Sequence, residues 1–213
     1  MTDWLNITFA SFDKTLLEFF HVLALKYGNI LTPISKILAV TCDLPLLMIG
    51  WLGFALFFIK KDKRCGMMMC GSVIIGAFLT TIIIKNIVYR PRPYVDSETY
   101  KAWWQMFKIK ADWDTSFPSG HVCAAMSGVT GYFIWSKKKN VAWIAYLYPI
   151  IIAASRLYLC VHYPSDTIAS IIVGLISAII CIPCVNLIYY LINKFPNNFF
   201  SRYCLTGSFK KQG

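Results

Sequence analysis

The sequence predicts an all-α fold: a polytopic transmembrane helix bundle of about five to six membrane helices, with interfacial amphipathic helices beside it. Two observations carry this prediction. The 213-residue chain is 57% apolar and 15% charged, whereas a soluble domain is about 25% charged. Its apolar residues also gather into long runs, most of them near the roughly 17–25 residues that cross a bilayer. We therefore expect residues 1–213 to form a single membrane-embedded domain.

Five apolar runs are the predicted membrane-spanning segments. In chain order they are residues 44–59, 66–88, 119–135, 141–161 and 167–192. Residues 1–42 precede these runs and are predicted to form an interfacial or re-entrant segment. Residues 94–117 are predicted to form an outer loop that contains an amphipathic helix.

Two amphipathic helices are expected in these flanking segments, because apolar side chains recur there at helical spacing. The first follows Asp13, the expected N-cap, and the second follows Asp96-Ser97. The recurring side chains are Leu16, Phe19, Phe20 and Leu23 in the first helix and Tyr100, Trp103, Trp104 and Phe107 in the second. Both helices are expected to lie in the membrane interface, with their aromatic rings at headgroup depth.

The basic residues predict the orientation of the bundle. Eleven of them lie between the first two runs, between the third and fourth, or after the fifth, together with one acidic residue, Asp62. By the positive-inside rule these segments are cytoplasmic. Membrane topology therefore accounts for the formal charge of +11, and no nucleic-acid partner is predicted. The eleven are Lys60, Lys61, Lys63, Arg64, Lys137, Lys138, Lys139, Lys194, Arg202, Lys210 and Lys211.

The first group of candidate site residues is Lys85 with Arg92-Pro93, at the outer end of the second run. The two cations are seven residues apart, about two helical turns, but the prolines on either side of Arg92 predict that the helix ends near Tyr89. Arginine binds phosphate oxygens in a bidentate manner, and lysine supplies a compact charge. The alternative is that both cations snorkel to lipid headgroups, which is the role we assign to Arg90.

The second group is Pro118-Ser119-Gly120-His121, which precedes the third run and is typical of a helix start. Backbone N–H groups at that start, together with the Ser119 hydroxyl, can bind an anion. Gly120 lets the backbone approach the anion closely. His121 then adjoins the anion and can act as a general acid. The alternative interpretation is a capped helix without further function.

The third group is Ser155-Arg156, then His162 and Asp166, at the boundary between the fourth and fifth runs. Pro164 places Asp166 in the first turn of the fifth span, from which its carboxylate can reach the ring of His162. A carboxylate on one ring nitrogen leaves the other free to attack phosphorus. The alternatives are a structural His–Asp pair, and an Arg156 that only pairs with a neighbouring acid.

Neither a metal nor another cofactor is predicted. The chain has three histidines and lacks an HExxH motif or a cluster of carboxylates. Most of its eight cysteines fall inside apolar runs, where cysteine behaves as a small hydrophobic residue.

Together the three groups resemble the complete signature of the type 2 phosphatidic acid phosphatase family, whose superfamily includes acid phosphatases and vanadium haloperoxidases. The resemblance implies that His162 is the nucleophile, Asp166 its orienting partner, and His121 an acid and then a base. It also implies a metal-independent site that opens to the noncytoplasmic side. The phosphoryl oxygens would be bound by Lys85, Arg92, Ser119, Gly120 and Arg156.

The expected function is that of a lipid phosphate phosphatase in a bacterial plasma membrane, with a phosphohistidine intermediate and its site on the outer face. Its substrate would be a phosphomonoester or diphosphate, such as phosphatidic acid, phosphatidylglycerol phosphate, undecaprenyl diphosphate or a phosphorylated glycolipid. Residues 100–108 would be either a membrane anchor or a lip that guides the headgroup. An anion transporter and a catalytically silent lipid-binding relative are the alternatives. The sequence leaves the oligomeric state and transfer to acceptors other than water open.

Overall fold

The structure is a computed structural model that describes residues 2–43, 53, 63–112, 114–137 and 139–206. All regular secondary structure in these residues is helical. The helices are α1 (Thr2–Thr8), α2 (Ala10–Asp43), α4 (Lys63–Ala77), η1 (Phe78–Ile84), α5 (Lys85–Val88), α6 (Pro93–Asp96), α7 (Glu98–Gln105), α8 (Gly120–Trp135), α9 (Lys139–Ile144), α10 (Leu147–Tyr158), α11 (Pro164–Lys194) and α12 (Phe199–Thr206).

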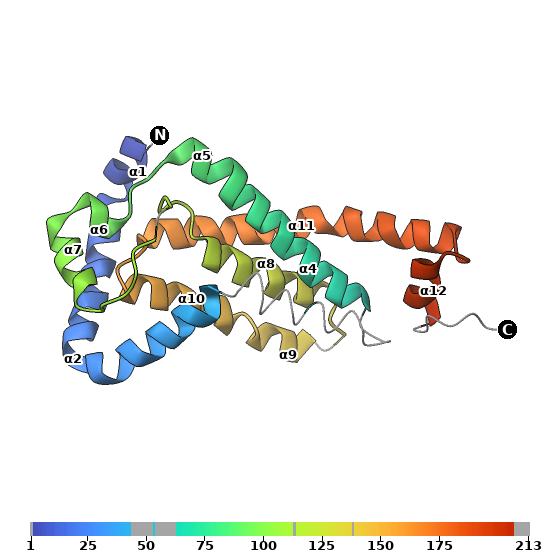
Figure 1. Ribbon diagram of the computed structural model, residues 1–213, viewed down its shortest axis with the longest axis horizontal. Helices are drawn as coiled ribbons and strands as arrows, with labels where there is room; N and C mark the ends of the chain where they lie inside the picture. The colour runs from blue at the N-terminus through green and yellow to red at the C-terminus, as the bar shows by residue number, and fades with distance from the viewer. Residues whose placement is uncertain (1, 44–52, 54–62, 113, 138, 207–213) are drawn as a thin grey trace.

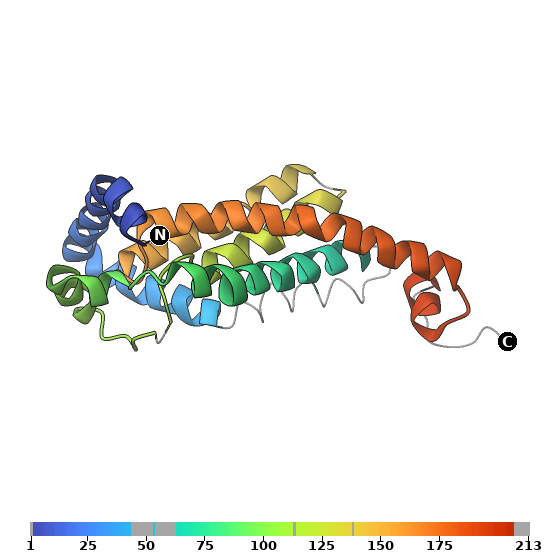
Figure 2. The ribbon, with the colours of Figure 1, turned by 90° about the horizontal axis from the view of Figure 1, so that it is seen from above.

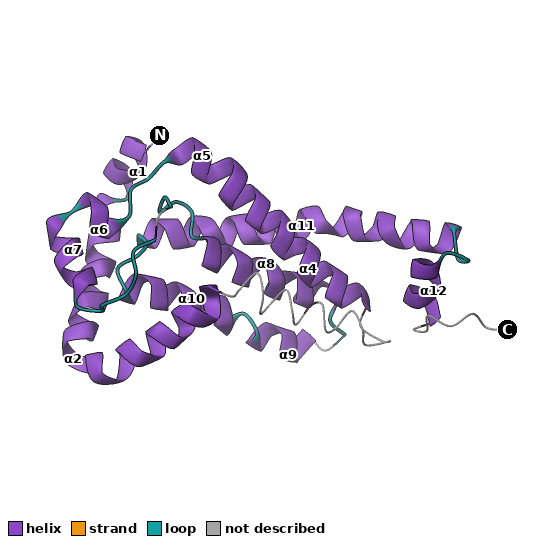
Figure 3. Cartoon of the chain, viewed as in Figure 1, coloured by secondary structure: helices purple, strands orange, loops and turns teal. Residues whose placement is uncertain are grey.

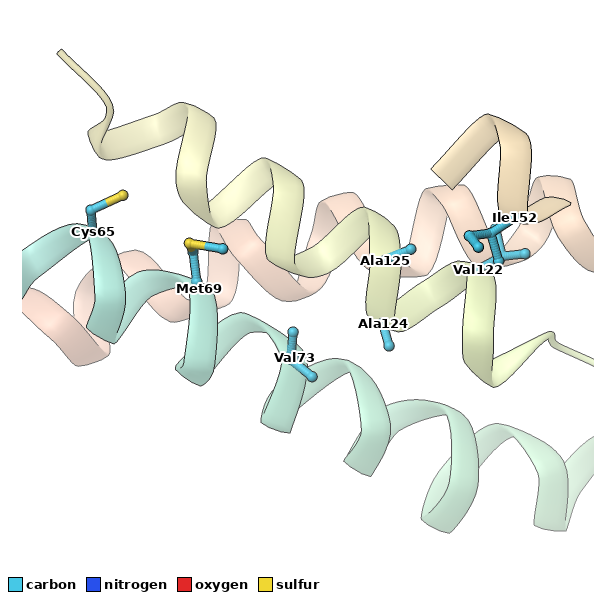
Figure 4. Close-up of a cluster of buried hydrophobic side chains, with 7 residues drawn as sticks. All are labelled: Cys65, Met69, Val73, Val122, Ala124, Ala125 and Ile152. Carbon is cyan, nitrogen blue, oxygen red and sulfur yellow. The ribbon is translucent and has the colours of Figure 1, made fainter. Parts of the chain in front are cut away.

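The helices α4, α8 and α11 form the centre of the bundle and run side by side (Figures 1 and 2). Small residues let them approach closely: a Cβ at Gly131 would lie 2.7 Å from the Met68 carbonyl oxygen, and one at Gly174 would lie 2.7 Å from the Met126 Cβ. Figure 4 shows Val73 of α4 facing α8 in the apolar core. Such close contact between backbones is typical of helices that pack in a membrane.

The N-terminal helix α2 wraps around one end of this bundle and is kinked at Tyr27, where φ is −124° and ψ is 20°. Beyond the kink it packs against α10, and the hydroxyl of Thr32 lies 2.8 Å from that of Tyr158. The predicted helix in residues 1–42 is therefore present, but the predicted N-cap is wrong. Because α2 already begins at Ala10, Asp13 lies inside its first turn.

The amphipathic helix predicted within residues 94–117 is α7, which begins after Ser97 as expected. Phe107 lies beyond its C-terminal end and is buried against Tyr158, with ring centroids 5.2 Å apart. The predicted end of the helix that carries Lys85 is confirmed. This helix, α5, ends at Val88, and Tyr89 adopts a left-handed conformation with φ of 45°.

Two stretches of the described chain are long and apolar enough to cross a membrane, Lys63–Asp96 and Pro164–Lys194. The predicted count of five to six membrane helices is thus not confirmed, and the first predicted run, 44–59, falls almost entirely outside the described residues. The run 141–161 is not one continuous helix, because two turn residues separate α9 from α10. Pro149 explains this break, since a proline clashes with the carbonyl four residues before it, here that of Ala145.

Candidate active site

The predicted site residues come from three loops and helix ends at the same end of the bundle. The loop between α7 and α8 and the connection between α10 and α11 both lie there, beside α1, α2, α6 and α7 (Figure 3). The structure therefore brings together segments that are far apart in the sequence.

Lys85 and Arg92 meet on one carboxylate, that of Asp114. Both cations are buried, and each forms an ion pair with Asp114. Arg92 also pairs with Asp112 at 2.9 Å. Although burial alone would raise it, hydrogen bonds from Lys85 and Arg92 lower the pKa of Asp114 to about 2. The snorkelling alternative is wrong for both cations, because they converge on a shared oxyanion instead of reaching outward.

His162 is buried beside Arg92, with 1% of its surface exposed. Its Nδ1 lies 2.8 Å from the carbonyl oxygen of Ser116. A carbonyl oxygen only accepts hydrogen bonds, so Nδ1 carries the proton and Nε2 keeps its lone pair. That Nε2 lies 3.3 Å from Nη1 of Arg92.

Burial and the positive charges around His162 favour the neutral form of its ring. Burial, followed by the positive charges of Arg92 and Lys85, lowers the pKa of His162 well below its ordinary value of 6.5. His121 and Arg156 act on the pKa of His162 in the same direction. These four side chains, from all three sequence groups, therefore lie within electrostatic reach of one imidazole.

Asp166 is close to His162 but does not form the expected hydrogen bond with its ring. The Oδ2 atom of Asp166 is 3.7 Å from Nδ1, which is too long for a hydrogen bond. Oδ2 instead accepts hydrogen bonds from the Ser116 hydroxyl and from the N–H of Tyr163, the latter at 2.9 Å. The Ser116 carbonyl orients the ring, and Asp166 holds Ser116. No motif marked Ser116 in the sequence.

Arg90 was predicted to snorkel to the headgroups, but the structure places it in the protein interior. It is 1% exposed and pairs with Asp13 at 2.8 Å and with Asp166 at 2.6 Å. Its remaining hydrogen bonds go to Ser165 Oγ at 2.7 Å and Asn6 Oδ1 at 2.9 Å. Tyr89, the left-handed residue that precedes Arg90, ends the helix. The side chain of Arg90 then lies in the protein interior.

Asp13 ties the N-terminal helix to the start of α11. Its Oδ1 accepts a hydrogen bond from the N–H of Ser165 at 2.8 Å, and its Oδ2 accepts one from the Ser165 hydroxyl at 2.7 Å. The carboxylate is 3% exposed. The predicted interfacial segment thus contributes a buried charge next to the candidate site.

Ser119 and Gly120 begin α8, as predicted. Ser119 is the N-cap and is fully buried. Its hydroxyl has no hydrogen-bond partner within the part of the chain that the structure describes. A Cβ placed on Gly120 would meet open space, with no atom within 4 Å. An unpaired hydroxyl beside open space at a helix N-terminus is suited to an anionic group.

Arg156 is buried in the last turn of α10, and His121 is half-buried in the first turn of α8. Among the described residues, no group of three or more His, Cys, Asp or Glu side chains is placed to hold a metal ion.

The comparison with known families agrees with the sequence signature. The sequence model of the PAP2 superfamily matches residues 66–190, more than half of the chain. The chain therefore belongs to the PAP2 superfamily, as the resemblance had predicted. The matched segment contains every predicted site residue, whereas Asp13 lies outside it.

Two curated bacterial proteins are similar to part of the chain. "Undecaprenyl-diphosphatase BcrC" of Bacillus subtilis (strain 168) is 25% identical over 119 residues, which are 56% of this chain and 58% of that protein. "Bacitracin transport permease protein BcrC" of Bacillus licheniformis is 25% identical over 134 residues, or 60% and 61% of the two chains. The aligned region thus spans about three-fifths of the length of these relatives.

The fold is also shared with a solved structure. The crystal structure of Aquifex aeolicus LpxE superposes with a TM-score of 0.54 at 22% sequence identity, over 78% of this chain and 94% of that one. This likeness concerns the arrangement of helices.

Proposed function

We propose that this protein is a membrane lipid phosphate phosphatase that hydrolyses a phosphomonoester or diphosphate through a phosphohistidine intermediate. The observation that carries the proposal is the geometry of His162. Its Nδ1–H is held by the Ser116 carbonyl at 2.8 Å, and its unprotonated Nε2 lies 3.3 Å from Arg92. A neutral imidazole with a fixed tautomer next to a buried guanidinium is suited to attack a bound phosphate.

In the first step, Nε2 of His162 forms a bond to phosphorus as the bond from phosphorus to the leaving oxygen breaks. The electron pair goes to that oxygen, which receives a proton from His121 acting as general acid. In the second step, His121 takes a proton from water, the resulting oxygen attacks phosphorus, and the N–P bond breaks. Inorganic phosphate is released and His162 returns to its neutral state.

The positive charges stabilise the phosphoryl oxygens during both steps. Lys85 and Arg92 already converge on the carboxylate of Asp114, so a phosphate that replaces this carboxylate meets two arranged cations. Arg156, the Ser119 hydroxyl and the backbone at Gly120 complete the phosphate site. The orienting role of Asp166 is indirect and passes through Ser116.

The membrane arrangement is part of the same proposal. Residues 1–213 form one membrane-embedded domain of five to six membrane helices, with an interfacial segment 1–42 and an outer loop 94–117. Large exposed apolar side chains on α11 support membrane embedding, among them Ile172, Ile179 and Leu187. The distribution of basic residues supports a site on the noncytoplasmic face of a bacterial plasma membrane. In this arrangement, membrane lipids surround the protein and also supply its substrate.

Release of inorganic phosphate tests the proposal. Purified protein in proteoliposomes is supplied with phosphatidic acid, phosphatidylglycerol phosphate, undecaprenyl diphosphate or a phosphorylated glycolipid, with EDTA present. We expect release from at least one lipid by the wild type, and acid-labile phosphate trapped on the wild type but not on His162→Ala. Label that persists on His162→Ala, or anion flux without phosphate release, would contradict it.

A further inference from the structure

Tyr163, the residue that follows His162, has a buried side chain that the mechanism proposed above does not use. Tyr163 is 5% exposed and is the N-cap of α11. Its backbone N–H donates to the Asp166 carboxylate, and its carbonyl accepts the N–H groups of Asp166 and Thr167 at 3.0 and 3.3 Å. The backbone of Tyr163 therefore starts α11, while its side chain reaches another segment of the chain.

The ring of Tyr163 covers one face of the Arg90 guanidinium. The Cζ atom of Arg90 lies 3.9 Å from the centroid of the ring. The N–H groups at the edge of the guanidinium donate to Asp13, Asp166 and Ser165. A buried cation is attracted to the face of an aromatic ring, so the ring helps to fix the position of Arg90.

The hydroxyl of Tyr163 donates a hydrogen bond to the Asp96 carboxylate at 2.8 Å. Burial and this hydrogen bond raise the pKa of Tyr163, so the hydroxyl stays protonated and remains a donor. Asp96 is the last residue of α6, and its own N–H donates to the carbonyl oxygen of Arg92 at 3.0 Å. The hydroxyl is thus connected to the backbone of Arg92 through a single residue.

The two contacts of the Tyr163 side chain lie on either side of Arg92 in the sequence. Arg90 is two residues before Arg92, and Asp96 is four residues after it. A proline on each side of Arg92 also restricts the backbone of this segment. One side chain next to the proposed nucleophile therefore holds both ends of the segment that carries a proposed phosphate-binding cation.

These contacts differ from those that the Arg92 side chain makes itself. The Arg92 guanidinium lies 3.3 Å from Nε2 of His162, and it donates to the Val161 carbonyl and to Asp114. A phosphate bound to Arg92 takes over N–H groups of this guanidinium, so some of these hydrogen bonds are exchanged. The contacts of Tyr163 with Arg90 and Asp96 do not use these N–H groups and are not displaced by phosphate.

We propose that Tyr163 is a positioning residue, which holds Arg92 and the phosphate bound to it at the distance from which Nε2 of His162 attacks. The inference rests on the proposed function and adds a residue to its machinery. Correct placement of the reacting groups lowers the barrier of the chemical step. Loss of the hydrogen bond between Tyr163 and Asp96 leaves the phosphate-binding groups in place and slows the attack.

The test is steady-state kinetics of phosphate release by the full chain in proteoliposomes, with the lipid that the wild type hydrolyses. Tyr163→Phe keeps the ring over Arg90 and removes the hydroxyl. We expect kcat to fall about fivefold, the effect of one hydrogen bond. KM should stay within about twofold, because the lost contact acts on the chemical step. Asp96→Ala should have the same effect, whereas Asp96→Asn keeps an acceptor oxygen and should retain more activity.

A double variant and a matched control separate positioning from packing. Because Tyr163→Phe and Asp96→Ala remove the same hydrogen bond, kcat of the double variant should fall no further than that of the weaker single variant. The control is Tyr158→Phe. Tyr158 is also buried, and its hydroxyl lies 2.8 Å from that of Thr32, between α10 and α2. This variant loses a similar hydrogen bond that does not reach Arg92, and its kcat should be unchanged.

Three results would overturn the positioning role while the proposed function stands: wild-type kcat in Tyr163→Phe, an equal loss in Tyr158→Phe, or losses that multiply in the double variant. A change confined to KM would assign Tyr163 to substrate binding and overturn the positioning role as well. Absence of phosphate release by the wild type would instead contradict the proposed function, and with it any role of Tyr163 in the reaction.

Discussion

The carboxylates of Asp13 and Asp166 bind the same guanidinium group, that of Arg90, at 2.8 Å and 2.6 Å. One cation between two carboxylates leaves a net charge of −1 within the protein interior. Asp166 lies 3.7 Å from the ring of His162. In the proposed mechanism, this remaining negative charge stabilises the positive charge that develops on the imidazole when Nε2 attacks phosphorus.

The Asp13→Asn substitution removes that excess charge while it keeps an oxygen that accepts from the Ser165 N–H. Arg90 then fully offsets Asp166, and the developing charge on His162 loses its support. We expect kcat to fall about tenfold, or about 1.4 kcal/mol of transition-state stabilisation, with KM within about twofold. Steady-state kinetics with a lipid phosphate measures both parameters.

Two comparisons separate this effect from simple unfolding. Asp3→Asn removes an exposed acid of α1 and should leave kcat unchanged, and Asp13→Glu should restore part of the lost activity. An Asp13→Asn protein with wild-type kcat would show that the charge has no bearing on the reaction.

Ser116→Ala removes the hydroxyl that donates to Asp166 but keeps the carbonyl that accepts from His162. Without the hydrogen bond to Asp166, the Ser116 carbonyl that orients His162 is held less firmly. We expect kcat to fall about fivefold, the value of one hydrogen bond of about 1 kcal/mol. Thr115→Ala is the matched control, because the Thr115 hydroxyl is buried without a hydrogen-bond partner among the described residues. Equal losses in the two variants would argue against the orienting role.

Asp114 pairs with Lys85 and Arg92, the two cations proposed to bind the substrate phosphate. Its pKa of about 2 keeps it ionised at any working pH, so it competes with phosphate throughout. We expect Asp114→Asn to lower KM about fivefold, since a partly exposed ion pair contributes up to about 1 kcal/mol. The inhibition constant of inorganic phosphate should fall with it. The control Glu98→Gln, at an exposed acid on α7, should change neither constant. An increase in KM for Asp114→Asn would refute the competition between Asp114 and phosphate.

The pH dependence of kcat/KM tests the neutrality of His162. Its lowered pKa means that the ring loses its nucleophilic form only well below pH 6.5, so the acidic limb should lie there. Arg92→Gln removes a neighbouring positive charge, which should raise the pKa of His162 and move this limb to higher pH. Arg64→Gln, on a residue outside the site, should leave the limb in place. A wild-type limb at pH 6.5 or above would contradict the assignment.

The same shift links His162 to stability. The neutral ring of His162 makes a contribution to the free energy of unfolding that is fully present above about pH 6.5. As the pH falls below that value, the unfolded chain binds a proton that the folded protein does not bind, and this contribution is lost.

The sequence predicted the parts of the site that depend on local spacing. Lys85 and Arg92, Ser119 and Gly120, and His162 and Asp166 each lie within one short segment, where residue type and helix ends indicate their placement. Asp13 and Arg90 are 77 residues apart, and Asp13 and Ser165 are 152 residues apart. Nothing in a local pattern shows that such distant groups meet.

Two features of the fold were misjudged, for different reasons. Hydropathy joined residues 141–161 into one span, whereas the effect of Pro149 on the preceding turn could have been recognised from the sequence. The position of Asp13 inside α2 depends on packing against α11, because its carboxylate binds Ser165 instead of capping its own helix.

The bond between Asp13 and the start of α11 has a consequence for how the smallest working unit of this protein is defined. Sequence similarity delimits residues 66–190, but a chain trimmed to that segment would leave Arg90 with Asp166 as its single counter-ion and the N–H of Ser165 without the carboxylate that binds it. A folded unit that keeps this buried group of charges therefore begins at least as early as α2.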